Sequence, residues 1–460
     1  MKTVSSLLLL FLSMMSFGQN FSRLSTASAT SVDALVNAKI SSEKMVGAAI
    51  ALVKNGEIVY LKGYGYADEE LEIDATPNTT YRIASNSKMF TAMLALQLWE
   101  DGDLDITKDV RDYVSEFPIK SNTVTTENVL TNESGLESWT YHDASVAAKY
   151  IMANPFTYKP VDVLEIFDTD PLKFTPGTQY LYSNKGFDVA AAVVERAGTG
   201  SFEDQLYARI CDVADMPFFQ MGVGGRMPYY NQAQGYKIVN GAAVVDKGGN
   251  GGHDDVSHFG GGGGMVASAR DIGHFIKAFV NDDLFDKKTT RVKMGSNHDP
   301  NNSNSYGYGL GFGYRNGDTL LLHGGQTTWS RCIFFFSPEN KNGIAVLSSN
   351  GSTNFDDLGT DLYDELNSVS LTGSAYTNPI SRTLAAPTLT LPANSTTINS
   401  KTVKLDWQSV NYADKYIYEY ADNAGFTSST LDTAYFDEIY LNNLSLNQTY
   451  YWRVKAINTY

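Results

Sequence analysis

The chain has 460 residues with a formal net charge of −16 at pH 7, and 43% of its residues are hydrophobic. This length predicts two or three domains, and the apolar fraction is sufficient for sizeable cores. Nucleic-acid binding needs clustered basic residues, and an acidic surface disfavours anionic lipid. The composition therefore argues against both kinds of partner.

The N-terminus has the pattern of a secretory signal peptide. Met1-Lys2-Thr3 precedes an apolar run from Leu7 to Phe17, and Ser16 and Gly18 form a small-x-small pair. The run is too short to span a bilayer. We therefore expect residues 1–18 to be a signal peptide and the mature protein to be secreted or periplasmic, with no membrane span.

Cys211 and Cys332 are the only cysteines. In an exported protein they could form a disulfide. Cysteines also occur as separate small hydrophobes in protein cores, and we favour this second interpretation.

In chain order, the first predicted elements are a helix and a hairpin. Residues 31–45 have amphipathic spacing, with four candidate buried positions, namely Val32, Leu35, Ile40 and Val46. Two apolar strands, 48–54 and 57–61, then flank Asn55-Gly56. This dipeptide is the strongest short signal for a β-hairpin.

The next segment, residues 81–99, contains Ser85-Asn86-Ser87-Lys88 and continues as an almost wholly apolar helix that ends at Gly102. A helix that is apolar on all sides is a buried helix. Ser85 and Lys88 are three residues apart, so they share one face at the positive end of the helix dipole. A hydroxyl within reach of an amine and of backbone N–H groups is what an acyl-transfer nucleophile requires.

The middle of the chain predicts helices and long loops, and strands return before residue 350. Helices are expected over residues 187–197, 202–213, 269–279 (capped by Ser268) and 355–369. Strands are expected over residues 308–314, 319–323, 330–336 and 343–348, with a turn at Asn316-Gly317. Strands at both ends with helices between them predict an α/β chain whose sheet is closed by N- and C-terminal segments.

A second domain is predicted at the C-terminus, because the composition changes to Thr, Ser, Asn and Pro after Gly373. Residues 403–407 and 416–420 alternate with the period of two that strands show, which predicts an all-β sandwich. The expected organisation is a signal peptide over 1–18, a main domain over 30–370, a linker over 371–384 and an all-β domain over 385–460.

Three motifs carry the functional prediction: Ser85-x-x-Lys88, Tyr182-x-Asn184 and His323-Gly324-Gly325. Each alone is weak, because a serine often caps a helix, a tyrosine often packs in a core and a histidine often lies on a strand. All three occur in fitting places. The serine opens a buried helix, the tyrosine follows the Pro176-Gly177 turn, and the histidine ends an edge strand.

With these motifs the chain resembles the serine β-lactamase and penicillin-recognising superfamily over residues 30–370. It is most similar to the class C branch and the related D,D-peptidases and esterases. Further matching segments are Asn132-Glu133-Ser134-Gly135-Leu136, Gly263-Gly264-Met265, Ser268-Ala269-Arg270-Asp271 and Tyr308-Gly309-Leu310-Gly311. The resemblance implies an α+β fold with an antiparallel sheet and a helical subdomain.

The resemblance also implies roles for individual residues. Ser85 would be the nucleophile, and Lys88 and Tyr182 would share the acid–base work, with the division between them left open. Asn184 would hold a substrate amide and orient Lys88, and Gly324 and Gly325 would let the strand approach the substrate. The backbone N–H groups of Ser85 and Gln326 would form the oxyanion hole, worth about 3–4 kcal/mol per donor.

His323 stands where many relatives have lysine, so a strong site for a substrate carboxylate is disfavoured. The expected function is an exported serine hydrolase that forms an acyl-enzyme on D-amino-acid peptides or esters, with no cofactor. A class C-like β-lactamase is the second interpretation. A non-catalytic penicillin-binding-like protein that only holds its ligand is the alternative of another class.

Other candidate sites are weaker. His253, Asp254, Asp255 and His258 form a tempting metal cluster, but they lie in a glycine-rich loop, and we expect no metal there. The run Gly260 to Gly264 lacks the Lys-Ser/Thr of a phosphate loop. Ser134 is not in a Gly-x-Ser-x-Gly elbow, so we expect it to shape a loop near the site.

The C-terminal region resembles a fibronectin type III domain through Trp407, the strand at 416–420, and Leu444 with Tyr450. Such a module would offer a surface to a protein or cell-wall partner. A seventh strand is expected after residue 458, so we expect the sequence to belong to a longer exported protein.

Overall fold

The computed structural model describes residues 20–138, 158–164, 171–222, 231–245, 260–298, 305–351, 353–376, 386–408, 415–434, 438–442 and 444–457. The chain divides into two compact units, residues 1–377 and 378–460. The division falls within the linker expected from the sequence. Each unit is described by itself.

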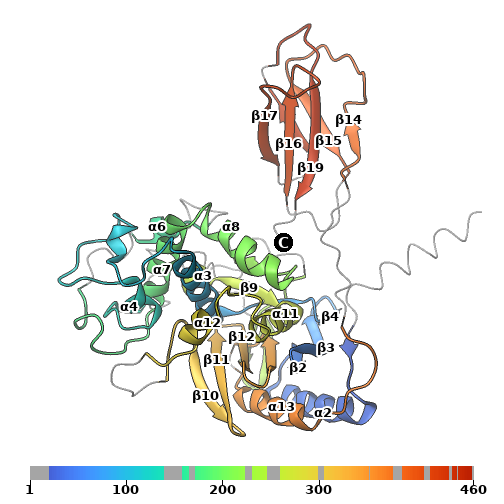
Figure 1. The fold of residues 1–460 in the computed structure, drawn as a ribbon. Coiled ribbons are helices and arrows are strands. Elements are labelled where there is room, and N and C mark those ends of the chain that lie inside the picture. The colour runs from blue at the N-terminus through green and yellow to red at the C-terminus, as the bar shows by residue number, and fades with distance from the viewer. Residues whose placement is uncertain are drawn as a thin grey trace, which may run out of the picture. The chain divides into compact units, whose positions relative to one another are not determined.

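An eight-stranded antiparallel sheet forms the centre of the first unit (Figure 1). Its strand order is β1-β3-β2-β13-β12-β11-β10, and β4 pairs with β3. The N-terminal strands are β1 (Phe21–Ser22), β2 (Gly47–Lys54), β3 (Glu57–Asp68) and β4 (Ile73–Asp74). The C-terminal strands are β10 (Gly311–Arg315), β11 (Asp318–Gln326), β12 (Arg331–Ser337) and β13 (Asn342–Ser348). The β2–β13 pair joins the two ends, so the predicted closure of the sheet is confirmed.

The two predicted Asn-Gly turns are both present. Asn55 and Gly56 have φ values of 54° and 75° between β2 and β3, and Asn316 and Gly317 have 53° and 88° between β10 and β11. Positive φ at both central residues is the geometry of a type I′ turn, which matches the twist of antiparallel strands. These turns fix the register of both hairpins.

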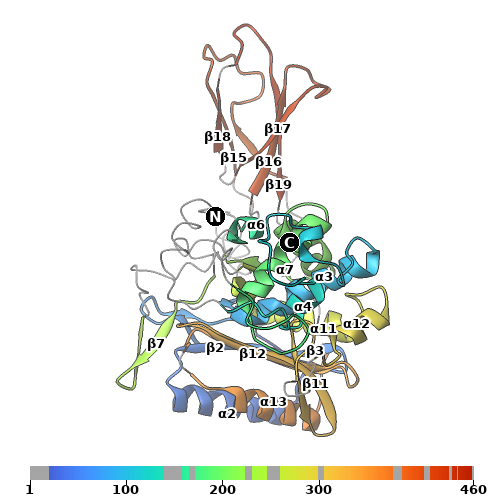
Figure 2. The same cartoon turned by 90° about the vertical axis from the view of Figure 1, so that its left-hand side faces the viewer.

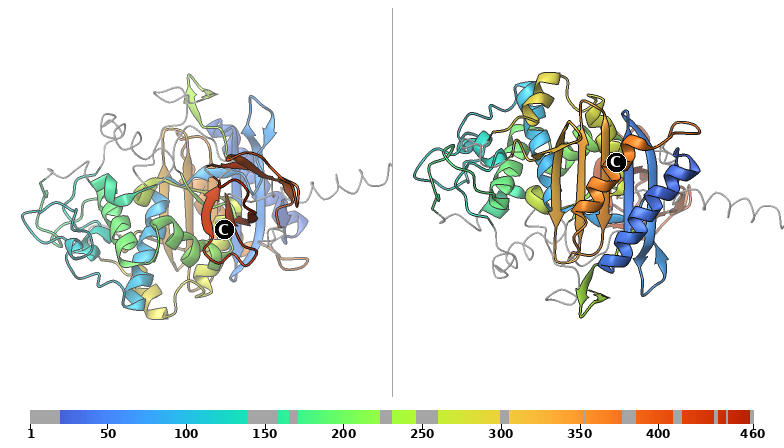
Figure 3. Two further views of the ribbon diagram at one scale, coloured as in Figure 1. Left: turned by 90° about the horizontal axis from the view of Figure 1, so that it is seen from above. Right: turned by 90° about the horizontal axis from the view of Figure 1, so that it is seen from below.

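Helices α2 (Thr26–Glu43) and α13 (Asp356–Ser368) cover one face of the sheet, as Figure 3 shows in its right-hand view. Their apolar side chains form one core with the strands, including Val32, Val36, Leu362, Ile344 and Val346. The sequence placed the first helix at 31–45. It begins earlier because the Ser25 hydroxyl accepts a hydrogen bond from the Ser28 N–H and caps it.

The opposite face carries the helical layer that is seen above the sheet in Figure 2. Its longer helices are α3 (Ser87–Asp101), α7 (Asn184–Ala197) and α11 (Ala269–Val280). Its shorter helices are α4 (Thr126–Leu130), α6 (Pro160–Val163), α8 (Phe202–Leu206), α9 (Asp212–Ala214), α10 (Gly260–Gly263) and α12 (Lys288–Met294). Helix α11 packs on β2 and β13, and α3 packs against α7 and α10.

Two predicted helices differ from expectation in their details. Helix α7 begins at Asn184 rather than at residue 187, because the Ser183 hydroxyl caps it by accepting from the Gly186 N–H. The helix predicted over 202–213 is interrupted by a π-helical turn, η4 (Tyr207–Cys211), between α8 and α9. Within the described part of the chain, no helix is both long and apolar enough to cross a bilayer.

Smaller elements complete the first unit. A three-stranded sheet has the order β5-β9-β6, with β5 (Thr80–Arg82), β9 (Met265–Ser268) and β6 (Gln220–Met221), and β7 (Tyr236–Val239) pairs with β8 (Ala242–Val245). The short 3₁₀ turns are η1 (Ala84–Asn86) and η2 (Val110–Asp112). Cys211 and Cys332 are both buried and form no disulfide with each other, as favoured from the sequence.

The second unit consists of two three-stranded antiparallel sheets, which agrees with the predicted all-β architecture. One has β14 (Leu389–Leu391), β15 (Val403–Trp407) and β18 (Glu438–Leu441), and the other has β17 (Thr430–Ala434), β16 (Lys415–Ala421) and β19 (Tyr451–Ile457). Trp407 is buried between them, with its ring 5.2 Å from that of Tyr416. The Tyr450 hydroxyl accepts from the Ser445 N–H at 3.0 Å, which is the bond of a tyrosine corner.

Candidate active site

Ser85 lies in the 3₁₀ turn η1, two residues before α3 begins at Ser87. The sequence predicted it at the N-terminal mouth of this helix. Ala84, whose φ is +48°, turns the chain before the helix begins. A non-glycine residue in this region costs roughly 1–2 kcal/mol. The surrounding structure holds the turn, because the Ser87 hydroxyl donates to the Ala84 carbonyl at 2.7 Å and the Ser330 hydroxyl donates to that of Arg82 at 2.6 Å.

Lys88 is fully buried in the first turn of α3, and its amine lies 3.2 Å from the Ser85 hydroxyl oxygen. The amine also donates to the Asn184 side-chain oxygen and to the Gly262 carbonyl, at 2.5 Å each. Burial lowers the pKa of Lys88 to about 7, against the opposing field of the Asp188 carboxylate. The lysine therefore has both of its protonation states available near neutral pH.

Tyr182 and Asn184 reach the same point from the start of α7. The Lys88 amine lies 4.7 Å from the centroid of the Tyr182 ring. The chain leading to α7 is held by Asn132, whose backbone carbonyl accepts from the Leu181 N–H and whose side chain accepts from the Ser183 N–H. Ser134 is buried in that loop and accepts from the Leu136 N–H, as expected of a loop-shaping residue.

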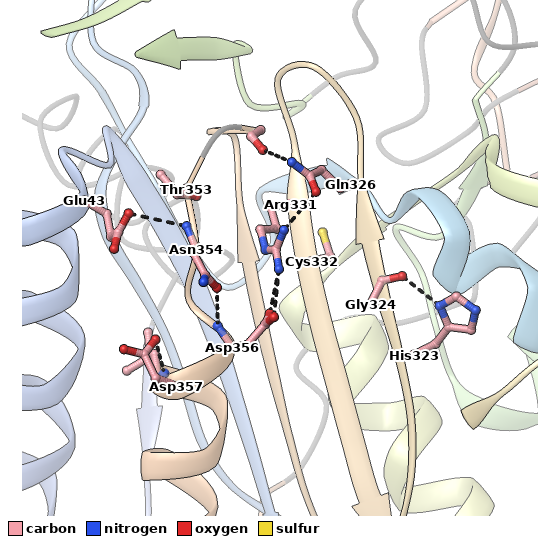
Figure 4. Close-up of polar contacts among 12 residues, drawn as sticks. Glu43, His323, Gly324, Gln326, Arg331, Cys332, Thr353, Asn354, Asp356 and Asp357 are labelled. Atoms are coloured by element: carbon pink, nitrogen blue, oxygen red, sulfur yellow. Dashed lines mark hydrogen bonds and ion pairs between the residues drawn. The ribbon is translucent and has the colours of Figure 1, made fainter. Parts of the chain in front are cut away.

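Strand β11 presents alternate residues to opposite faces of the sheet. The Gln326 side chain donates to the Gly351 carbonyl at 2.7 Å and accepts from Arg331 of β12 at 2.9 Å (Figure 4). Its side chain is thus committed away from Ser85, and what Gln326 can offer on that side is its backbone N–H. His323 and Gly325 have the opposite parity and lie on the side of η1.

The two glycines of the His-Gly-Gly motif are not equivalent. A Cβ on Gly325 would lie 2.0 Å from the Ile83 carbonyl oxygen, whereas a Cβ on Gly324 would meet nothing within 4 Å. Of these two glycines, only Gly325 is required for the close approach of β11 to η1. Strand β10 pairs with β11 up to Leu322, so the residues from His323 onward extend past the end of that pairing.

His323 is a neutral residue in this site. Its Nδ1 lies 2.7 Å from the Gly324 carbonyl, which accepts, so Nε2 is left as the acceptor for the Tyr306 hydroxyl at 3.2 Å. Burial and the nearby Lys88 lower the pKa of His323 to about 3. Burial is the main reason why this imidazole does not titrate near the ordinary histidine pKa of about 6.5.

Comparison with known protein families assigns the chain to a family. A family model described as Beta-lactamase matches residues 32–367, which is most of the chain. The chain belongs to the Beta-lactamase family. The fold and motif order predicted for the first unit agree with this membership, and its central sheet and helical layer are those of the family's fold.

Individual relatives of this Beta-lactamase family chain are distant. Protein flp of Staphylococcus aureus is 26% identical over 340 residues, which cover 71% of this chain and 64% of that protein. The chain thus spans about two thirds of the length of that relative. The penicillin-binding protein homologue of Pyrococcus abyssi is 22% identical with a TM-score of 0.60, covering 74% and 77% of the two chains. The D-stereospecific amidohydrolase of Streptomyces sp. is 20% identical with a TM-score of 0.60, covering 74% and 98%.

Several groups around the family's motifs were not identified from the sequence. The Gly262 carbonyl, a direct partner of Lys88, belongs to a glycine run whose last two residues were matched to the family, but no contact with Lys88 was predicted for it. Tyr306, which bonds to His323, and Tyr158, which bonds to Asp188, come from loops without any motif. Asp188 did carry a signal, because it is a lone acid among the apolar residues that α7 buries.

No metal site replaces or adds to this arrangement in the described residues, where no group of three His, Cys, Asp or Glu side chains is placed to hold an ion. The cluster His253, Asp254, Asp255 and His258 lies outside the described residues. The site is therefore built from a serine, a buried lysine, a tyrosine, an asparagine and a strand edge.

Proposed function

We propose that this chain is an exported serine hydrolase that forms an acyl-enzyme on D-amino-acid peptides or esters. The observation that carries the proposal is the buried Lys88 amine, 3.2 Å from the Ser85 hydroxyl and with a pKa lowered to about 7. An amine with this pKa accepts a proton from serine at neutral pH far more readily than an ordinary lysine does.

In the proposed reaction the Ser85 oxygen attacks the substrate carbonyl carbon, and its proton passes to Lys88 directly or through Tyr182. The negative charge that develops on the carbonyl oxygen is stabilised by the backbone N–H groups of Ser85 and Gln326. The proton then moves to the leaving amine or alcohol as the acyl bond breaks. In the second half, water attacks the ester carbonyl and loses a proton to the same base. The bond between the acyl group and the Ser85 oxygen then breaks, the proton returns to that oxygen, and the acid is released.

Asn184 has a positioning and binding role in this scheme. Its side-chain oxygen accepts from Lys88 at 2.5 Å, so the side-chain NH₂ is the group left to hold a substrate carbonyl. Tyr182 and Tyr306, with ring centroids 6.3 Å apart, form an aromatic wall beside His323. These groups orient the acyl part of the substrate.

The neutral state of His323 bears on which substrates the site would favour. A carboxylate next to the scissile bond gains little from an imidazole that carries no charge and whose two nitrogens already have partners. This favours esters, and peptides without a carboxylate beside the scissile bond, over β-lactams that carry one, so we place a class C-like β-lactamase second. The D-stereospecific amidohydrolase among the structural neighbours adds support for D-amino-acid substrates.

The proposal is tested by covalent capture of Ser85. The protein is incubated with a fluorescent penicillin and weighed intact, alongside Ser85→Ala and Ser42→Ala, an exposed serine on α2. We expect an adduct in the wild type and in Ser42→Ala and none in Ser85→Ala. Ester hydrolysis that survives Ser85→Ala would refute the mechanism, and ligand binding without an adduct or turnover would favour a non-catalytic binding protein.

The substrate class is then resolved with nitrocefin, a D-Ala-D-Ala peptide and short-chain p-nitrophenyl esters. We expect the esters or the peptide to be hydrolysed at a higher kcat/KM than nitrocefin. A preference for nitrocefin would instead support the β-lactamase.

Export and docking are part of the same proposal. The signal-like residues 1–18 support a secreted or periplasmic location. The tyrosine corner at Tyr450 supports a fibronectin type III-like second unit, which would offer a surface to a protein or cell-wall partner. Cell fractionation with an antibody against the first unit tests the location.

A further inference from the structure

We propose that Asp188 is a positioning residue whose buried carboxylate is the counter-charge for the Lys88 ammonium. The inference rests on the proposed function, because it assigns a role in the proton transfers of that reaction. The support comes from the burial of Asp188, from its place on α7 and from the hydrogen bonds around it.

Asp188 is completely buried, on a stretch of α7 that is otherwise almost entirely apolar. An ionised carboxylate is stable in such a place only when hydrogen bonds and a positive charge compensate for the loss of water. The Tyr158 hydroxyl donates to Asp188 at 3.2 Å and supplies a hydrogen bond without a charge. Lys88, which is also fully buried, is a positive charge whose field acts on the same region.

The position of Asp188 on α7 directs it toward Lys88. Residues four apart on a helix share a face, so Asp188 lies one turn behind Asn184. Asn184 itself accepts a hydrogen bond from the Lys88 amine. Both residues therefore act on the Lys88 amine, Asn184 through a hydrogen bond and Asp188 through its charge.

A second connection runs through the glycines of α10. The Tyr158 hydroxyl that donates to Asp188 also accepts from the Gly261 N–H at 2.9 Å, and the next residue, Gly262, accepts from Lys88. Tyr158 is itself buried, and a Cβ on Gly260 would lie 2.4 Å from its ring. The glycine run thus brings Tyr158 and Asp188 close behind the lysine.

The counter-charge has a purpose in acyl transfer. Lys88 has to take a proton when Ser85 attacks and give it up when the leaving group departs, so its two protonation states should be close in energy. Burial alone favours the neutral amine, and a nearby carboxylate favours the ammonium. The two effects together give the pKa of about 7.

Other polar and charged groups face this region and are accounted for. Ser85, the Tyr182 ring, Asn184, the Gly262 carbonyl and neutral His323 lie around the amine. Lys185, three residues before Asp188 on α7, is a second buried cation on the same helix, and the test below therefore follows the titration of Lys88 itself. On neighbouring elements, Asp162 of α6 is exposed, and Glu203 of α8 accepts from the Tyr207 hydroxyl.

Glu127 of α4 is engaged with Lys293 and His298. Asp188 is therefore the carboxylate that acts on Lys88.

The test measures the titration of Lys88 directly. Protein labelled with [ε-¹³C]lysine is titrated by NMR as wild type, Asp188→Asn, Asp188→Glu and Asp361→Asn, and the Lys88 signal is assigned with Lys88→Arg. Asp361 is an exposed acid of α13 and controls for the change in net charge. We expect the midpoint to fall by about one pH unit in Asp188→Asn. It should stay unchanged in Asp361→Asn and be partly restored in Asp188→Glu.

A second readout is the pH dependence of Ser85 labelling by a fluorophosphonate. In this step the Ser85 oxygen–phosphorus bond forms, fluoride leaves and the serine proton passes to Lys88, so the acidic limb follows the lysine. A purely structural Asp188 would lower the labelling rate equally at every pH, and an unmoved Lys88 midpoint would overturn the proposal. If Asp188→Asn does not fold, Tyr158→Phe replaces it, with a smaller shift in the same direction expected.

Failure of the proposed function gives a different result. A wild-type protein in which Ser85 is never labelled would refute the serine hydrolase. The NMR midpoints would still decide whether Asp188 is the counter-charge of Lys88.

Discussion

Replacing Gly325 with alanine should inactivate the site while leaving the fold in place. The new Cβ would lie 2.0 Å from the Ile83 oxygen and 2.6 Å from the Asn86 side-chain nitrogen, and real Cβ atoms essentially never come closer than 3.0 Å. Strand β11 and η1 must therefore separate by at least 1.0 Å, the difference between 3.0 and 2.0 Å. A misplacement of about 1 Å costs on the order of 100-fold in rate, because the oxyanion donors no longer face the carbonyl oxygen.

The matched control is Gly324→Ala, where the added Cβ meets nothing within 4 Å. Both variants are assayed for p-nitrophenyl ester hydrolysis, and their thermal unfolding is followed to verify that they fold. We expect kcat/KM to fall about 100-fold in Gly325→Ala and to stay close to wild type in Gly324→Ala. Equal activities in the two folded variants would refute the argument that β11 and η1 together build the site.

Two further predictions concern stability. His298 contacts Glu127 and Glu133, and these hydrogen bonds raise the pKa of His298 to about 9. The contribution of protonated His298 to the free energy of unfolding is therefore complete below pH ~6.5 and is lost as the pH rises through about 9. Because the side chain is 33% exposed, solvent screening reduces this contribution to about 1–2 kcal/mol. The Tm gap between wild type and His298→Gln should close between pH 6 and pH 10, and a constant gap would contradict this. Trp407→Ala should destabilise the second unit by about 3–5 kcal/mol, which would appear as a separate unfolding transition at lower temperature. Ester hydrolysis should be unchanged. A single shared transition would argue against independent units.

Local chemistry explains which features were predictable from the sequence. Asn55-Gly56 and Asn316-Gly317 form the expected turns, because positive φ at two successive positions is a local requirement. The Ser85–Lys88 contact also followed from sequence spacing, since residues three apart on a helix or a 3₁₀ turn are neighbours. The motif correctly placed His323 on a strand beside the site, but its expected position at the end of an edge strand was wrong, because β11 continues to Gln326 and β10 is the edge strand.

Features that depend on packing could not be predicted. The Gly262 carbonyl accepts from Lys88 only because α10 is folded against α3 and α7. The lowered pKa of His323 follows from burial and from the charge of Lys88. Its hydrogen-bond partner Tyr306 lies 17 residues earlier in the chain without any motif. The positive φ of Ala84 is a third case, because alanine gives no local sign of a left-handed turn.

The pairing of β2 with β13 has a consequence for how the first unit is made. Ala48 and Ser348 are register partners, 300 positions apart in the chain. While the ribosome is still adding the residues between them, β2 has no central neighbour other than β3, and Ser85 has neither β11 nor β12 beside it. Contacts between such distant segments form slowly, because the entropy of closing the long loop must be overcome first. On the proposed function, Ser85 therefore gains the groups that would activate it only after nearly all of the first unit has been synthesised.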